Sequence, residues 1–279
     1  MSGFLDDMAR HSRERVAAAR ALESDAALER RAADAEPAPP LALSPLGFDV
    51  IAEIKLRSPA VGVLGAEAGD WLDRAAAYGA AGAAAVSVLT EPSRFDGSLE
   101  HLQSVARRLR PQGVPAMRKD FLVDPYQVLE ARASGAGGVL VILRMLSAAQ
   151  CGELVDAAAR HGLFVLLEAF DADELALAGE IAAAHSGGGV LLAGLNCRDL
   201  QSLQVVPERF AELAPALPRH VPVVAESGIG APADAARLRR LGYRLALVGS
   251  ALMSHEDPGA WIGALLRAAR SMPGVKRLD

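Results

Sequence analysis

Short apolar segments alternate with helical segments over most of the chain, and this alternation limits the folds open to it. From residue 48 onward there are eight apolar runs of strand length, each followed by helical periodicity or helix-start residues. Eight such units in succession predict an α/β protein, a closed (β/α)₈ (TIM) barrel. The runs span residues 48–54, 83–89, 114–118, 138–143, 163–168, 190–195, 221–225 and 245–248.

A doubly wound open sheet is the alternative for this alternation. Its usual Gly-x-Gly-x-x-Gly turn after the first strand is absent, which favours the barrel. Several helix starts are marked by capping-box patterns, in which an N-cap side chain and the residue three positions later satisfy each other's backbone N–H groups. These patterns are Asp124 with Gln127, Ser147 with Gln150, and Asp171 with Glu174.

The chain before the first apolar run has a different composition. Residues 4–33 are rich in Ala, Leu, Arg and Glu and predict one or two amphipathic helices, which a Pro-rich connector at 36–46 ends. We therefore expect residues 1–46 to form a helical extension packed on a barrel of residues 47–279, in a single domain overall.

Composition restricts the partners and the location. The net charge is -5, and this leaves no basic surface for nucleic acid. No run approaches the roughly 18 uncharged apolar residues of a membrane span, and the charged N-terminus lacks the apolar core of a signal peptide. We expect a cytoplasmic protein that binds neither nucleic acid nor membrane. The acidic, Ala-rich surface gives no strong interface signal, so a monomer or weak homo-oligomer is expected.

The stretch Val50 to Pro59 begins like a buried strand but carries charged residues on one of its two faces. Strand alternation places Ile51, Glu53 and Lys55 on one face. Such a face is either the solvated side of an antiparallel strand or the inner wall of a barrel, whose strand C-termini carry the active site. Polar residues follow seven of the eight runs, which favours the barrel wall. They are Glu53 and Lys55; Thr90 and Glu91; Arg118, Lys119 and Asp120; Glu168; Asn196 and Arg198; Glu226, Ser227 and Gly228; and Gly249 and Ser250, while the fourth run offers only Arg144.

These strand ends predict acid–base chemistry on an anionic ligand. The Gly-Ser loops after the seventh and eighth runs predict a phosphate site, because glycine lets backbone N–H groups approach an anion. None of the six histidines is placed at a strand C-terminus, so we expect no metal centre and no organic cofactor. Cys197 should face away from the site and serve packing. Burial beside a second cation is expected to lower the pKa of a lysine there.

Several long motifs resemble one family. They are Ile51-Ala52-Glu53-Ile54-Lys55 with Ser58-Pro59; Ser87-Val88-Leu89-Thr90-Glu91 with Phe95-Asp96-Gly97-Ser98; Arg118-Lys119-Asp120-Phe121 with Asp124-Pro125-Tyr126-Gln127; and Ala225-Glu226-Ser227-Gly228-Ile229. In this order they resemble indole-3-glycerol-phosphate synthase of tryptophan biosynthesis, from the N-terminal helices to about Met253. The resemblance implies a carbon–carbon lyase with a barrel fold and an N-terminal segment that helps cover the mouth.

The implied reaction converts 1-(2-carboxyphenylamino)-1-deoxyribulose 5-phosphate into indole-3-glycerol phosphate, with loss of carbon dioxide and water. By position, Lys119 resembles the general acid for ring closure, and Glu168 a general base or an acid–base partner in dehydration. Lys55 resembles the second active-site lysine, which acts as an acid in dehydration. Glu53 and Asn196 resemble groups that orient the others and stabilise positive charge. The implied substrate-binding residues are Ser58, Phe95, Phe121, Arg198 and Glu226, and the implied phosphate-binding residues are Ser227, Gly228, Gly249 and Ser250.

The chain departs from the family pattern in the loop after the first strand. It has Leu56 where a basic residue is common, and Ala60-Val61 where the family commonly has Ser-Lys. Cys197 and Ala169-Phe170 are further departures. Two alternatives therefore stay open. One is a phosphosugar isomerase barrel, which the Glu–Lys pair of the first strand disfavours. The other is a paralogue that binds a ligand without turnover.

Overall fold

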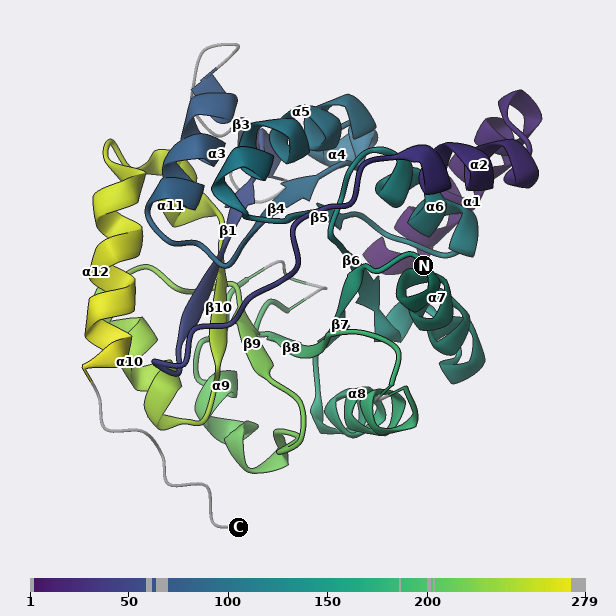
Figure 1. Ribbon diagram of the computed structural model, residues 1–279. Coiled ribbons are helices and arrows are strands. Elements are labelled where there is room, and N and C mark those ends of the chain that lie inside the picture. The colour runs from purple at the N-terminus through teal and green to yellow at the C-terminus, as the bar shows by residue number, and fades with distance from the viewer. Residues whose placement is uncertain are drawn as a thin grey trace.

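The computed structural model describes residues 3–58, 62–63, 70–185, 187–199, 202 and 204–271. Eight parallel strands close into a barrel in the order β1-β10-β9-β8-β7-β6-β5-β4 (Figure 1). Each predicted apolar run overlaps one barrel strand, so the predicted TIM barrel is confirmed. The strands are β1 Asp49–Ile54, β4 Ala85–Leu89, β5 Ala116–Lys119, β6 Gly138–Ile142, β7 Phe164–Ala169, β8 Leu191–Asn196, β9 Val223–Glu226 and β10 Leu245–Val248. The short strands β2 (Arg57–Ser58) and β3 (Gly62–Val63) form a separate antiparallel pair.

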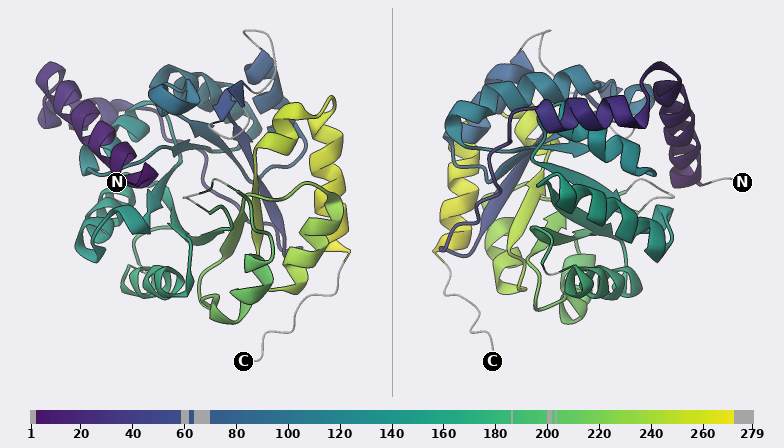
Figure 2. Two further views of the ribbon diagram at one scale, coloured as in Figure 1. Left: turned by 180° about the vertical axis from the view of Figure 1, so that it is seen from behind. Right: turned by 45° about the vertical axis from the view of Figure 1, so that its right-hand side comes forward.

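Helices surround the barrel and extend it at the N-terminus (Figures 1 and 2). They are α1 Phe4–Leu22, α2 Asp25–Asp34, α3 Asp70–Ala80, α4 Pro92–Phe95, α5 Leu99–Leu109, α6 Pro125–Ala133, α7 Ala148–Arg160, α8 Ala172–Ala184, α9 Arg209–Glu212, α10 Pro232–Arg240, α11 Ser250–Ser254 and α12 Pro258–Arg270. Short 3-10 helices span Arg110–Gln112, Leu143–Met145 and Ala214–Ala216. Within the described residues, none of the helices is long and apolar enough to cross a membrane.

Only one of the three predicted capping boxes forms as predicted. Ser147 and Gln150 satisfy each other's backbone N–H groups at the start of α7. At α6 the N-cap Asp124 accepts from Tyr126 N, but the Gln127 side chain accepts from Val123 N, one residue before the cap. Glu174 at α8 likewise accepts from Phe170 N. In both helices the side chain accepts from the residue before the N-cap, so it connects the preceding loop to the helix and leaves the N-cap N–H without this bond.

Strand alternation sorts the core into two layers. One cluster fills the barrel interior and includes Ile51, Met117, Leu140 and Leu166, all at most 1% exposed. The other lies between the strands and the helices and includes Val50, Ala52 and Ile54. The inward direction predicted for Ile51 is therefore confirmed. The same alternation carries Glu53, two residues further on, to the inner face.

The N-terminal helices pack against one side of the barrel. Leu28 and Ala32 of α2 and Val16 of α1 are buried with Tyr126 and Leu129 of α6. In both figures the purple α1 and α2 lie on the side of the barrel away from the yellow α12. The division at residue 46 into one extension and one barrel within a single domain stays a prediction.

A buried carboxylate closes the barrel at the N-terminal end of its strands. Asp49 begins β1 and accepts from Arg244, which precedes β10, at 3.1 Å and from Arg270 of α12 at 2.9 Å. Ser44 N also donates to it at 3.1 Å. Its side chain is 3% exposed. Burial raises the pKa of Asp49, although both arginines act against this rise. Asp49 therefore joins the first strand, the last strand and the last helix.

Asp49→Ala should destabilise the fold by about 3 kcal/mol, because it leaves two half-buried guanidinium groups without their carboxylate. The matched control is Asp73→Ala, which removes an exposed pair with Arg108 at 3.5 Å and should cost about 0–0.5 kcal/mol. Urea unfolding of both variants measures the difference. Equal effects would show that Asp49 does not join the strands as described.

Candidate active site

A cavity of about 610 Å³ lies at the C-terminal ends of the barrel strands. Every predicted site residue except Ser58 lines it. Ser58 lies in β2, and its side chain, like the whole of residues 59–61 with Ala60-Val61, lies outside the described part of the structure. The predicted residues in the lining are Glu53, Lys55, Phe95, Lys119, Phe121, Glu168, Asn196, Arg198, Glu226, Ser227, Gly228, Gly249 and Ser250.

Each cavity lysine is paired with one glutamate. The Lys55 ammonium lies 3.0 Å from Glu53 Oε1, and the Lys119 ammonium lies 3.4 Å from Glu168 Oε2. All four side chains are at most 17% exposed. Lys55 and Glu53 come from the end of β1, whereas Lys119 and Glu168 come from β5 and β7. The second pair therefore bridges two strands that have only β6 between them.

A hydrogen-bonded chain continues from Glu168 over the next two strands. Asn196 Nδ2 of β8 donates to Glu168 Oε1 at 3.2 Å. The other end of this amide, Oδ1, accepts from Ser227 Oγ at 2.9 Å and from Arg198 N at 3.0 Å. These contacts fix which way the Asn196 amide points. They also leave Glu168 between the Lys119 ammonium and the Asn196 amide donor.

The expected lowering of the lysine pKa does not occur at Lys119. Burial acts to lower its pKa, but the charges of Glu168, Glu226 and Glu53 outweigh burial and raise it above its ordinary value. The expected second cation, Lys55, is neutralised by Glu53. Lys119 is therefore an ammonium group at neutral pH, ready to give a proton and not to take one.

Glu226 is the third carboxyl group of the cavity and differs from the other two. It is 1% exposed, and neither of its oxygens has a hydrogen-bond partner. Gly194 on the neighbouring strand makes room for it, since a Cβ there would lie 2.1 Å from Glu226 Oε1. Burial, and next the charge of Glu168, raise the pKa of Glu226 well above its usual range, against the pull of Lys119. Glu226 therefore holds its proton more firmly than an exposed glutamate does.

The loops after β9 and β10 bring glycine backbone to the cavity wall. Ser227 and Gly228 are consecutive left-handed residues, with φ of 69° and 68°. A Cβ at Gly228 would lie 2.6 Å from Val205 Cγ1, so only glycine fits there. Gly249 precedes α11, and a Cβ at this position would meet Glu53 Oε1 at 2.3 Å. Both loops therefore bring bare backbone to the cavity wall.

Aromatic rings form another part of the wall. Phe121 follows β5, and its ring centre lies 6.1 Å from that of Phe95 in α4 and 5.8 Å from that of Phe4 in α1. The start of α1 thus reaches the mouth. The sequence reasoning missed Phe4 and Leu5, because helical periodicity does not tell where a helix packs. It also missed the apolar lining formed by Leu140, Ile142, Phe170, Val205, Pro207, Ile229 and Leu247.

Cys197 lies behind the cavity wall, as predicted. It is fully buried in the cluster between strands and helices, and its Sγ lies 3.6 Å from Ser227 O. Burial raises the pKa of this thiol to about 11. In the part of the chain that the structure describes, no three His, Cys, Asp or Glu side chains are grouped to hold a metal ion.

Glu226→Gln should stabilise the protein increasingly as the pH rises. The folded wild type keeps a proton on Glu226 that the unfolded chain loses above about pH 4.3. Wild-type stability therefore falls between that value and the raised pKa, by up to about 1.4 kcal/mol per pH unit, whereas the amide does not titrate. Urea unfolding at about pH 5, 7 and 8.5 tests this difference. Glu14→Gln, at a site 61% exposed, is the control. If the stability difference between Glu226→Gln and wild type changes as little with pH as that of the control, the raised pKa of Glu226 is contradicted.

Comparison with known proteins agrees with this site. The family model described as Indole-3-glycerol phosphate synthase matches residues 5–265. The indole-3-glycerol phosphate synthase of Rhodococcus opacus (strain B4) is 39% identical over 95% of both chains, and that of Nocardioides sp. (strain ATCC BAA-499 / JS614) is 43% identical over 82% of both. A solved 3-hexulose-6-phosphate synthase, at a TM-score of 0.59 and 20% identity over 79% of this chain and 99% of its own, shares the fold. The chain belongs to the indole-3-glycerol phosphate synthase family.

Proposed function

We propose that this chain forms indole-3-glycerol phosphate from 1-(2-carboxyphenylamino)-1-deoxyribulose 5-phosphate by acid–base catalysis between Lys119 and Glu168. The family to which it belongs consists of carboxy-lyases of tryptophan biosynthesis. The observation that carries the proposal is the buried Lys119–Glu168 pair, 3.4 Å apart, in a cavity that also holds aromatic rings and two glycine loops.

Lys119 gives its proton to the ribulose carbonyl oxygen in the first step. The carbonyl carbon then accepts the electron pair of the aromatic carbon that bears the carboxylate, and the new ring closes with a positive charge. Loss of carbon dioxide returns an electron pair to the ring and restores its aromaticity. The raised pKa of Lys119 ensures that the proton is present at neutral pH, and the buried glutamates stabilise the cationic intermediate.

The second half of the reaction removes water. Lys55, paired with Glu53, protonates the departing hydroxyl, and Glu168 takes the proton that is lost as the indole double bond forms. Asn196 supports this step because its amide fixes the orientation of the Glu168 carboxylate. Glu226, whose raised pKa favours its neutral form, donates a hydrogen bond to the bound substrate.

Substrate binding follows the order of the strands. β5 and β9 lie four strands apart in either direction around the barrel. Phe121 and Phe95 hold the substrate's aromatic ring on the β5 side, with Arg198 and Ser58 at its carboxylate. Ser227, Gly228, Gly249 and Ser250 hold the phosphate on the β9–β10 side. This arrangement stretches the substrate across the mouth and sets its carbonyl beside Lys119.

The two alternatives left open by the sequence were a phosphosugar isomerase and a paralogue that binds a ligand without turnover. The family match leaves no support for the phosphosugar isomerase. A paralogue that binds without turnover is tested by the assay below. The cytoplasmic location and the monomer or weak homo-oligomer stay predictions.

The assay supplies the carboxyphenylamino-deoxyribulose phosphate with a chelator and no added cofactor, and follows indole fluorescence. Folded wild type should form product, and Lys119→Met should lower kcat by roughly 10²–10⁴-fold, the range for loss of a general acid. Lys276→Met is the matched control, since Lys276 is the one lysine of the sequence besides Lys55 and Lys119, and kcat should stay within about twofold of wild type. No product from folded wild type would refute the activity; an unaffected Lys119→Met would refute the role of Lys119.

A further inference from the structure

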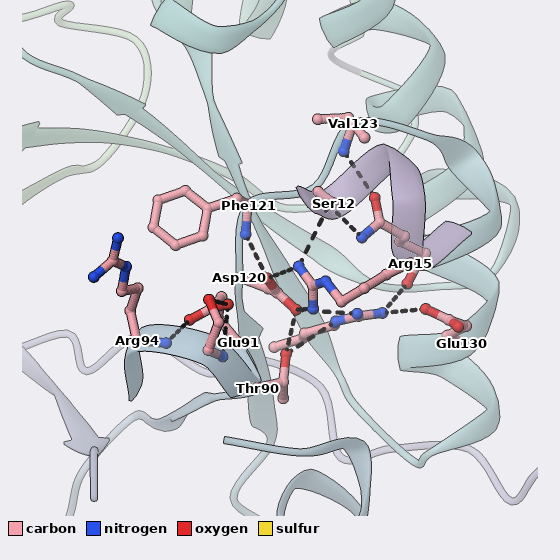
Figure 3. A network of polar contacts seen from close by, with 12 residues as sticks. Ser12, Arg15, Thr90, Glu91, Arg94, Asp120, Phe121, Val123 and Glu130 are labelled. Carbon is pink, nitrogen blue, oxygen red and sulfur yellow. Dashed lines mark hydrogen bonds and ion pairs between the residues drawn. The ribbon is translucent and has the colours of Figure 1, made fainter. Parts of the chain in front are cut away.

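A buried polar network lies beside the cavity, between α1 and the ends of β4 and β5 (Figure 3). It includes Thr90, Arg118 and Asp120, which belong to the motifs of the sequence but have no role in the chemistry proposed above. Arg118 and Asp120 alternate with Lys119 and Phe121 along the chain. Lys119 and Phe121 line the cavity, whereas the side chains of Arg118 and Asp120 hydrogen-bond to each other and to the network.

Asp120 is the centre of this network. Its side chain is fully buried and accepts two hydrogen bonds from Arg15, at 2.9 and 2.7 Å. Thr90 Oγ1 donates to it at 2.8 Å, Phe121 N at 2.8 Å and Arg118 at 3.2 Å. Burial disfavours the carboxylate, but the hydrogen bonds from Arg15 and the charge of Arg118 hold the pKa of Asp120 well below its usual range. It is a permanent charge with a fixed position.

The backbone around Lys119 needs such an anchor. Lys119 is the last residue of β5, and pairing with β6 has already ended at Arg118. On the β4 side the ladder ends with Thr90 N donating to Lys119 O at 3.0 Å. No strand pairing therefore holds the chain beyond Lys119. The Asp120 side chain takes over this task, because it ties the next peptide group, Phe121 N, to Thr90 and to α1.

One face of α1 reaches both residues that follow Lys119. Phe4, Met8, Ser12 and Arg15 are spaced so that they lie along one side of the helix. Phe4 contacts the Phe121 ring, and Arg15 lies on Asp120. Ser12, which is fully buried, accepts from Gln127 at 2.9 Å and fixes the helix between these two contacts.

We propose that Asp120 is a positioning residue for Lys119, held by Arg15, so that the docking of α1 sets the place of the reacting lysine. The inference rests on the proposed function, because it takes Lys119 to be the proton donor. It goes beyond that function because it gives an N-terminal helix outside the barrel an effect on kcat, exerted through a charge pair. A helix that only covered the mouth would act on KM.

The chain offers a matched control for Arg15 on the same helix. Arg20 of α1 donates to Asp124 at 2.8 and 2.7 Å, also a two-bond arginine–aspartate contact to the segment after β5. Asp124 caps α6 and lies four residues beyond Asp120. Arg15→Met and Arg20→Met therefore remove the same kind of contact between α1 and the barrel. Only the first removes a contact next to Lys119.

Arg15→Met should lower kcat at least about tenfold, since small misplacement of a reacting group is costly, while Arg20→Met keeps kcat within about twofold. Phe4→Ala should raise KM for the substrate with kcat within about twofold, because it removes binding shared by the ground state and the transition state. Arg15→Lys keeps the charge but not the two-bond geometry and should recover part of kcat. Thermal unfolding identifies the folded samples.

Equal losses of kcat in Arg15→Met and Arg20→Met would overturn the proposal, as would a folded Arg15→Met with wild-type kcat. Adding Asp120→Asn to Arg15→Met should lower kcat less than the two separate effects combined, since both act through one contact; full additivity would also overturn it. Lys119→Met in the same series separates the two questions. If that variant keeps its activity, the proposed function fails, whatever the arginine variants show.

Discussion

Placing lysine ammonium groups inside a cavity with largely apolar walls is costly, and the rest of the site depends on how this cost is offset. Each of Lys55 and Lys119 has one glutamate within reach. The third carboxyl group, Glu226, has no hydrogen-bond partner, and burial raises its pKa. Glycines at 194 and 249 give Glu226 and Glu53 the space they occupy. The strand sequences are therefore constrained by charge as much as by packing.

The alternation of side chains along a strand separates the groups that react from those that hold them. On β5 and just beyond it, Lys119 and Phe121 line the cavity, while the side chains of Arg118 and Asp120 hydrogen-bond within the buried network. On β1 the same rule puts Glu53 inside and Ala52 and Ile54 against the helices. Because both sides of one strand are needed, a single substitution at its end can disturb chemistry without touching substrate.

Much of this arrangement follows from the sequence. The eight apolar runs place the strands, and most of the polar residues after them line the cavity, because parallel strands in a barrel end on one rim. Lysine usage carries a further signal that the sequence reasoning did not use. Of 29 basic residues three are lysines, Lys55, Lys119 and Lys276, and two of them line the cavity. Arginine cannot give up its proton in a protein, so two cavity lysines in a chain that otherwise uses arginine fit the proton transfers proposed above.

What the sequence did not predict depends on contacts between distant segments. The pKa of Lys119 is set by glutamates on three other strands, so the expectation that it falls was wrong in sign. Likewise, nothing local in α1 tells that Phe4 and Arg15 meet the two residues after Lys119, more than a hundred positions away. The periodicity of that helix reveals an apolar face but not its partner. The residues that react can be read from their own strands, whereas those that position them become visible only once the chain has closed on itself.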